Sequence, residues 1–128
     1  MQVLLDTHTL LWWLLGDTRL SRAARAAITD ERNGVYVSAA SSWEVATKHR
    51  VGRLPDAVAL LGSIAEHIAG QGFVALDITV QHGERAGALP GPHRDPFDRM
   101  LAAQAQSARL TLVSNDRIFD AYGVARLW

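Results

Sequence analysis

QVLLDTHTLLWWLL, residues 2–15, joins a strand-like run to a helix-like one. Residues 2–6 contain the short apolar run Val3, Leu4 and Leu5, which is typical of a buried strand, and residues 7–15 are suited to a helix. A strand that leads directly into a helix is the first half of a βαβ unit. This stretch therefore predicts a parallel sheet covered by helices.

The rest of the chain continues the alternation of strand and helix. Ser21 is a suitable N-cap for a helix that runs to about Arg32, and Gly70 and Gly72 are placed to close another helix. Right-handed crossovers between such strands give a mainly parallel sheet with helices on both faces, a three-layer α/β/α sandwich. Further strands are expected at residues 34–38, 73–77, 110–114 and 124–128, further helices at 41–52, 56–69, 80–89 and 96–108, and a helical turn at 116–122.

Length and composition indicate one compact domain, residues 1–128. Thirteen basic side chains balance thirteen acidic ones, so there is no broad positive field of the kind that general nucleic-acid binders carry. The absence of cysteine excludes disulfides, thiolate catalysis and cysteine-based zinc sites. The longest apolar run, residues 10–15, is far shorter than the ~20 residues that span a bilayer. We therefore expect a soluble protein, and a cytoplasmic location is compatible with this composition.

Four acidic side chains come after strand-like runs or in the first turns of the helices that follow them. Because the carboxyl ends of parallel strands meet at one edge of a sheet, these side chains are expected to converge on one cleft. Carboxylates so close together repel one another, and a hard divalent cation offsets that repulsion. The sequence thus predicts a metal site formed by Asp6, Glu44, Asp98 and Asp116.

Three of these acids also have a local explanation. Ser41 and Glu44 match the capping box, in which a glutamate at N3 reaches back to the N-cap amide. Asp98 falls in the first turn of the helix expected at 96–108, where it complements the helix dipole. Asp116 is placed to cap the turn that follows it. For each residue taken singly, this structural explanation competes with a role in the metal site. It becomes weaker when the four acids are considered together.

Asp6, the fourth of these acids, and Asp95, which is not among the four, differ from each other in this respect. Asp95 directly precedes Pro96 and is a natural N-cap, with proline at the first helical position. Asp6 has no comparable explanation, because it follows three apolar strand residues, where a buried unpaired carboxylate is costly. We therefore interpret Asp95 as structural and Asp6 as functional.

The chain resembles the PIN-domain ribonucleases, specifically the VapC toxins of bacterial toxin–antitoxin pairs. Four stretches carry the resemblance: LLDTHTLLWWL, SAASSWEVA, HRDPFDRMLAAQA and LVSND. It covers essentially the whole chain, and HRDPFDRMLAAQA is its most specific part. The resemblance implies a PIN-like fold and places the four acids of the family on Asp6, Glu44, Asp98 and Asp116. Ser114 stands where many relatives have threonine, so the hydroxyl is retained.

The resemblance further implies hydrolysis of RNA phosphodiesters with Mg²⁺, or with Mn²⁺ as a substitute. Mg²⁺ keeps several water ligands, so Asp6 and Asp98 are expected to bind it directly. Glu44 and Asp116 would bind through water, position a second metal or orient the nucleophile. Either one or two metals is compatible with the sequence. Thr7, Ser38, Ser114 and Asn115 are candidates for orienting the ligands, or are only turn and cap residues, and Arg50, Arg53, Arg94 and Arg99 are candidates for binding RNA phosphates.

The partners implied by the resemblance are an RNA substrate, a second copy of the chain and a cognate antitoxin whose tail covers the cleft. Residues 10–15 make the first helix apolar nearly all round. Trp12 and Trp13 are either buried between sheet and helices or in contact with another chain. The alternative function is a PIN-like module that binds RNA or protein without catalysis. Retention of all four acids favours the enzyme.

Other enzyme classes fit poorly. The segment VLLDTHT has His8 where aspartyl-phosphate phosphatases need a second aspartate, and Gly70 and Gly72 precede a strand instead of opening a helix, which excludes a dinucleotide fingerprint. The five histidines lack zinc spacing. Only His93 is expected near the cleft, as a loop histidine bonded to backbone.

Overall fold

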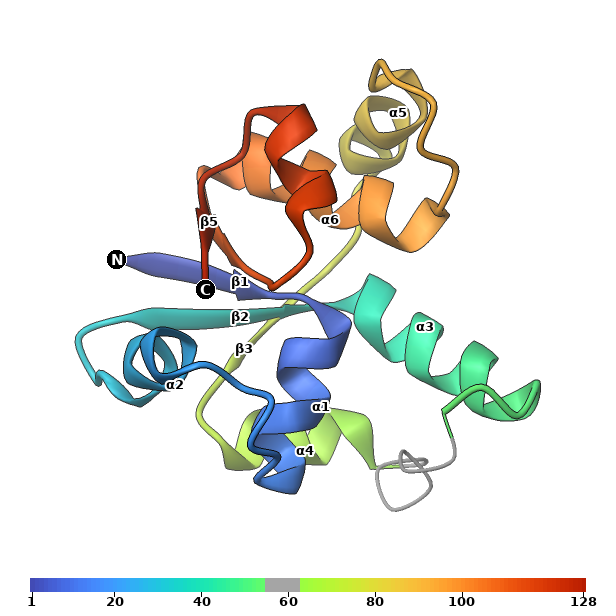
Figure 1. The fold of residues 1–128 in the computed structure, drawn as a ribbon. Helices are drawn as coiled ribbons and strands as arrows, with labels where there is room; N and C mark the ends of the chain where they lie inside the picture. Colours follow the sequence, from blue (N-terminus) through green and yellow to red (C-terminus); the bar gives the residue numbers. More distant parts are fainter. Residues whose placement is uncertain (55–62) are drawn as a thin grey trace.

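A parallel five-stranded sheet forms the centre of the protein, in the strand order β3-β2-β1-β4-β5 (Figure 1). The computed structural model describes residues 1–54 and 63–128. The strands are β1 (Gln2–Leu5), β2 (Gly34–Ser38), β3 (Val74–Leu76), β4 (Thr111–Val113) and β5 (Arg126–Leu127). The helices are α1 (Thr7–Leu15), α2 (Arg22–Thr29), α3 (Ala39–Arg50), α4 (Ile64–Gly70), α5 (Val80–Ala88), α6 (Pro96–Ala108) and the 3₁₀ helix η2 (Arg117–Tyr122).

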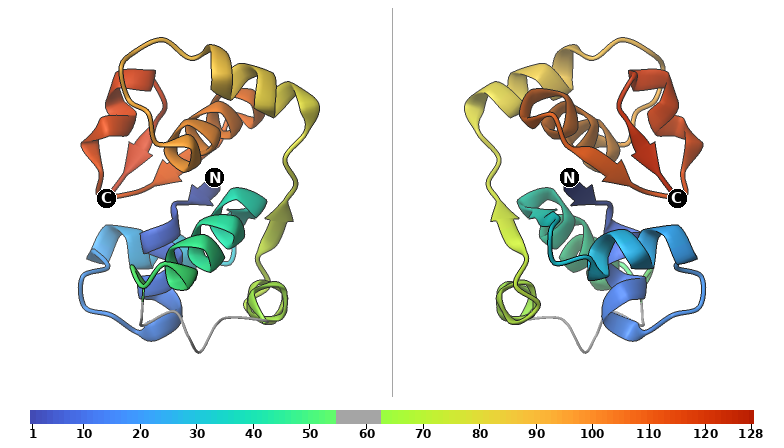
Figure 2. Two further views of the ribbon diagram at one scale, coloured as in Figure 1. Left: turned by 90° about the vertical axis from the view of Figure 1, so that its right-hand side faces the viewer. Right: turned by 90° about the vertical axis from the view of Figure 1, so that its left-hand side faces the viewer.

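Helices cover both faces of the sheet because its central strand is apolar on both sides. In β1, Val3 and Leu5 belong to the core shared with α1, α2 and α4, whereas Leu4 packs into the core formed with α6 and η2. Figures 1 and 2 show the two helical layers on opposite sides of the strands. The predicted three-layer α/β/α sandwich is confirmed.

The register of the central strands brings three chain segments to one edge of the sheet. Leu5 at the end of β1 pairs with Val37 of β2 on one side and with Val113 of β4 on the other. The next residue in each segment is polar and buried: Asp6, Ser38 and Ser114. Since β1 has β2 and β4 on its two sides, the chain reverses its direction of winding here, which is where open α/β sheets bind ligands.

Two expected helix boundaries are wrong, each for a local reason. Helix α3 begins at Ala39, because the Ser38 hydroxyl accepts a hydrogen bond from the Ala40 N–H at 3.0 Å and caps the helix. Ser41 therefore lies inside α3, and the capping box proposed for Glu44 does not form. Helix α2 ends at Thr29 instead of continuing to about residue 32, because the backbone turns extended at residue 30. Part of the helix expected at 56–69 lies outside the described residues.

Helix α1 is held mainly inside the protein. Trp12 is buried in the core between the sheet and α2, and Trp13 is partly buried against Phe73, with a ring separation of 6.3 Å. The indole N–H of Trp13 donates to Gln71 at 2.9 Å. Leu15 at the end of the helix is 44% exposed. For the two tryptophans, burial between sheet and helices accounts for the apolar character of α1.

Candidate active site

Asp6 connects β1 to α1 and caps the helix. Its Oδ1 accepts a hydrogen bond from the Thr9 N–H at 2.8 Å, and the residue is only 7% exposed. Burial raises the pKa of this carboxyl group, and hydrogen bonds with Ser114 and Thr9 offset part of the rise. The interpretation that Asp6 has no capping role is therefore wrong. The buried carboxylate that the sequence anticipated at this position is nevertheless present.

Glu44 points inward from α3 and is 4% exposed. The Thr7 hydroxyl donates to Glu44 Oε1 at 2.5 Å, and Lys48, one turn further along α3, forms an ion pair with Oε2. These two partners offset the cost of burying the carboxylate. The sequence argument did not place Lys48 at the site. Its spacing of four residues from Glu44 on one helix was the available signal.

Asp98 occupies the third position of α6, with Asp95 as the N-cap and Pro96 at the first helical position, as predicted. Asp98 Oδ2 lies 2.9 Å from His93 Nε2. Burial raises the pKa of Asp98 to about 6, the hydrogen bond with His93 lowers it, and the charges of Asp95 and Glu44 raise it further. The expectation that His93 bonds to backbone is wrong, because its ring contacts this carboxylate.

Asp116 lies two residues beyond Ser114 and caps η2. Its Oδ1 accepts a hydrogen bond from the Ile118 N–H at 3.0 Å, and its own N–H donates to the Ser114 hydroxyl at 3.0 Å. The side chain of Asp116 is exposed, unlike that of Asp6. The capping explanation holds for Asp116, and so does its predicted place at the carboxyl edge of the sheet.

The four acids line one hollow of about 230 Å³ at this edge. In the described part of the chain, no three acidic or histidine side chains lie close enough together to form a ready-made metal site. Each of the four carboxylates instead has a hydrogen-bond or ion-pair partner within the protein. Besides Asp6, Glu44, Asp98 and Asp116, the lining consists of Thr7, His8, Lys48, Asp95 and Asn115.

The predicted supporting residues separate into two groups. Thr7, Ser114 and Asn115 contact the acids or line the hollow. Ser38 instead caps α3 and donates to Gln104 Oε1 at 2.5 Å, and it does not line the hollow. Gln104 in turn donates to the Asp77 carbonyl, so Ser38 belongs to a buried network that ties β2 to α6.

The predicted phosphate ligands are also divided. Arg50, Arg53 and Arg94 are exposed. Arg99 instead donates hydrogen bonds to four backbone carbonyl groups, including that of Leu89 at 2.5 Å and that of His93 at 3.0 Å. This guanidinium holds the segment between α5 and α6 in place and is not free to bind a phosphate.

The family model described as "PIN domain" matches residues 3–125. The chain belongs to the PIN domain family. A curated relative, ribonuclease VapC16 of Mycobacterium tuberculosis, is 31% identical over 68 residues, 53% of this chain and 48% of the relative. This PIN domain therefore matches about half the length of that relative.

Solved structures share the fold at low sequence identity. VapC20 of Mycobacterium tuberculosis, described as a sarcin-ricin loop cleaving toxin, superposes with a TM-score of 0.68 at 18% identity and covers 96% of each chain. DNA-bound VapBC from Salmonella typhimurium gives 0.68 at 17% identity over 98% of this chain and 96% of that chain. FitAcB from Neisseria gonorrhoeae gives 0.61 at 24% identity, with the same two coverages. These likenesses establish the architecture of the PIN domain.

The raised pKa of Asp98 predicts a pH-dependent contribution to stability. The folded-state pKa of about 6 lies above the ordinary aspartate pKa of 3.8, so between these pH values the folded PIN domain binds this proton more tightly than the unfolded chain does. The contribution of Asp98 to stability therefore falls as the pH rises from about 4 to 6. Asp98→Asn removes this pH-dependent contribution. The free energy of unfolding of the variant minus that of the wild type should therefore rise by about 2–3 kcal/mol between pH 4 and pH 6.

Urea unfolding of both proteins in EDTA, from pH 4 to 7.5, measures this difference. Asp30→Asn is a suitable control, because the pKa of Asp30 is lowered by its hydrogen bonds with Arg32 and the sign of its pH dependence is opposite. A difference between Asp98→Asn and wild type that stays constant with pH would mean that Asp98 titrates normally in the folded protein.

None of the helices in residues 1–54 and 63–128 is long and apolar enough to cross a membrane.

Proposed function

We propose that this PIN domain is a metal-dependent endoribonuclease and acts as the toxin of a toxin–antitoxin pair. The observation that carries the proposal is the convergence of four carboxylates on one hollow, from segments as far apart in sequence as Asp6 and Asp116. A buried carboxylate and one with a raised pKa are features of sites built to perform chemistry or to bind a cation.

The donor set fits Mg²⁺, with Mn²⁺ as a substitute, because both cations prefer carboxylate oxygens. Asp6 and Asp98 are the proposed direct ligands. Glu44 is held by Thr7 and Lys48, which supports a role through water for this residue. Asp116 is exposed and is available to orient the attacking water. When bound, the metal would activate water and offset charge on the pentavalent transition state.

The protein's own residues have defined tasks in this scheme. Thr7 and Lys48 orient Glu44, the helix cap on Asp6 fixes the direction of its carboxylate, and Ser114 connects Asp6 to the backbone of Asp116. These contacts set the acids in place before substrate arrives, so less reorganisation is needed during the reaction.

RNA is the proposed substrate because the matched relative is named a ribonuclease and one fold neighbour is described as cleaving the sarcin-ricin loop. Arg50, Arg53 and Arg94 are exposed and remain the proposed contacts for RNA phosphates. Together with the neutral overall charge, this predicts selection of RNA by shape and by individual contacts instead of by a general field.

A cognate antitoxin and a second copy of the chain are the proposed protein partners. Several fold neighbours are described as toxin–antitoxin complexes, including one from Klebsiella pneumoniae with a TM-score of 0.61. On this PIN domain, the exposed end of α1 at Leu15 is one apolar position available for such contacts.

A metal-titrated cleavage assay tests the proposal. Purified protein treated with chelator should leave RNA intact, and millimolar Mg²⁺ or Mn²⁺ should restore cleavage. Induced expression should slow growth, and sequencing the cleaved RNA ends would identify the target. Cleavage of no RNA at any metal concentration, joined to metal-independent melting, would favour the alternative of a binding module without catalysis.

The two aspartates of the DPFD stretch should behave differently. Asp95 Oδ1 accepts hydrogen bonds from the Phe97 N–H at 2.9 Å and the Asp98 N–H at 3.1 Å. Asp95→Ala should therefore lower the free energy of unfolding by about 0.5–2 kcal/mol, with cleavage largely retained in the folded protein. Asp95→Asn, which still caps, is the matched control. Loss of activity without a change in melting temperature would identify Asp95, instead of Asp98, as the metal ligand.

A further inference from the structure

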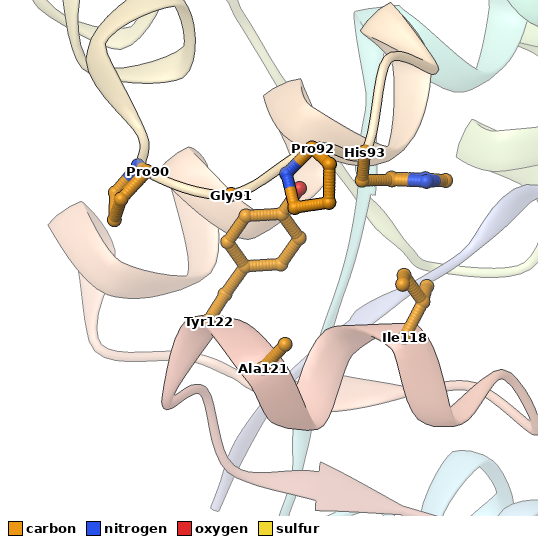
Figure 3. Close-up of a pocket in the computed structure, with 7 residues that line it drawn as sticks. All are labelled: Pro90, Gly91, Pro92, His93, Ile118, Ala121 and Tyr122. Atoms are coloured by element: carbon orange, nitrogen blue, oxygen red, sulfur yellow. The ribbon is translucent and has the colours of Figure 1, made fainter.

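A second hollow, linked to the acidic one by the contact between His93 and Asp98, has a different chemistry. It measures about 380 Å³ and lies between residues 90–93 and the η2 residues Ile118, Ala121 and Tyr122 (Figure 3). Its walls are proline rings, aliphatic side chains and the Tyr122 ring, and its volume falls in the range of small-molecule sites, which begins at about 300 Å³. The acidic hollow, at about 230 Å³, is smaller.

A hydrogen bond of His93 connects the lining of one hollow to that of the other. The His93 side chain lines the apolar hollow, while its Nε2 lies 2.9 Å from Asp98 Oδ2, and Asp98 lines the acidic one. Arg94 follows directly, is exposed, and makes no hydrogen bond or ion pair with the described residues. Only His93 would thus separate an RNA phosphate bound at the acids from the next part of the nucleotide bound in the apolar hollow. The guanidinium of Arg94 would lie beside both and could pair with a phosphate.

The Tyr122 hydroxyl gives this hollow an unsatisfied polar group. It is buried and, within the described part of the chain, has no hydrogen-bond partner, a state that usually costs stability. Figure 3 shows the ring standing up from η2 toward Pro92. Pro90 and Pro92 have no N–H to offer, and the Leu89 and His93 carbonyls already accept bonds from Arg99.

We propose that the apolar hollow receives the base of a nucleotide next to the scissile phosphate and that Tyr122 reads its edge. The inference rests on the proposed ribonuclease function. Unstacked RNA bases are recognised by stacking on aromatic side chains and by hydrogen bonds to their edges, and Tyr122 offers both. Because Pro92 covers the hydroxyl, the base reaches it only when Pro92 shifts. Arg99 holds the Leu89 and His93 carbonyls at the two ends of the turn, so the shift is confined to residues 90–92, where Gly91 has a φ of 102° and no side chain.

Binding of short single-stranded RNA in EDTA, measured by fluorescence anisotropy, tests the hollow without requiring catalysis. Ala121→Leu fills the hollow from the exposed surface of η2 and should weaken binding about 10-fold, the loss expected for one stacked base. Ala88→Leu, the same change at an exposed position of α5 outside this hollow, is the control and should bind like the wild type. Equal losses in both variants would overturn the proposal.

Tyr122→Phe separates the hydroxyl from the ring. Removing a buried unpartnered hydroxyl should leave the melting temperature unchanged or raise it. In metal, sequencing of ends from a randomised RNA pool should show altered base preference at one position beside the cut, with the preference at other positions kept. Unaltered preference together with unchanged binding by Ala121→Leu would overturn the inference.

The outcomes also separate this inference from the function on which it rests. If the wild type cleaves RNA and both variants behave like it, only the base site is wrong. If the wild type binds RNA through this hollow in EDTA but cleaves none with metal, only the catalytic proposal fails. If the wild type binds no RNA, or Ala121→Leu affects only the capture of an antitoxin or a second copy, the base site is overturned.

Discussion

Asp98→Asn should lower metal-dependent RNA cleavage by more than about 100-fold, because even residues that only support metal ligands are worth about 10–100-fold. The substitution preserves the shape of the side chain and leaves the N-cap of α6 on Asp95. It removes a carboxylate whose charged form is disfavoured by burial and by Asp95 and Glu44. The metal-free variant should therefore fold normally and melt at a higher temperature than the wild type.

Asp6→Asn should give the same loss of cleavage and of growth inhibition. Asparagine still caps a helix, so the hydrogen bond from the Thr9 N–H to the side chain can be kept and α1 should remain intact. Single-turnover cleavage at several Mg²⁺ concentrations and circular dichroism measure activity and fold together. Undiminished cleavage by a folded Asp98→Asn protein would remove Asp98 from the site, and the same result for Asp6→Asn would remove Asp6.

Millimolar Mg²⁺ or Mn²⁺ should raise the melting temperature of the wild type. A cation that binds only the folded state adds roughly 3 kcal/mol when its concentration is 100 times its Kd. The stabilisation should be large here because it also relieves repulsion between carboxylates that line one hollow. Mn²⁺ should act more strongly than Mg²⁺, since it binds such oxygen sites more tightly and tolerates looser geometry.

In Asp6→Asn the shift with metal should shrink sharply, because the ligand set is incomplete, although this variant should melt higher than wild type without metal. Glu84→Gln is the matched control: it removes one negative charge at an exposed position of α5 and should keep the full metal response. A wild-type melting curve that does not respond to metal would argue against a cation site among these acids.

Local signals in the sequence were sufficient for most of the architecture. The apolar run of residues 3–5 predicted a buried strand. The pair Asp95 and Pro96 predicted the start of α6 correctly, because N-cap chemistry depends on neighbouring residues alone. The predicted start of α3 was wrong, because Ser38 and Ser41 are both chemically able to cap a helix. Only the end of β2 against β1 decides that Ser38 does so.

The sequence by itself determined which acids reach the carboxyl edge of the sheet, since alternating strands and helices and parallel pairing follow from hydrophobic pattern and chain connectivity. Tertiary structure decided what each acid touches there. Lys48 forms an ion pair with Glu44, the ring of His93 contacts Asp98, and Arg99 donates its hydrogen bonds to backbone carbonyl groups. The spacing of four residues was a signal for the Lys48 contact. The contacts of His93 and Arg99 depend on the packing of loop and helix segments, so neither spacing nor residue type specifies them.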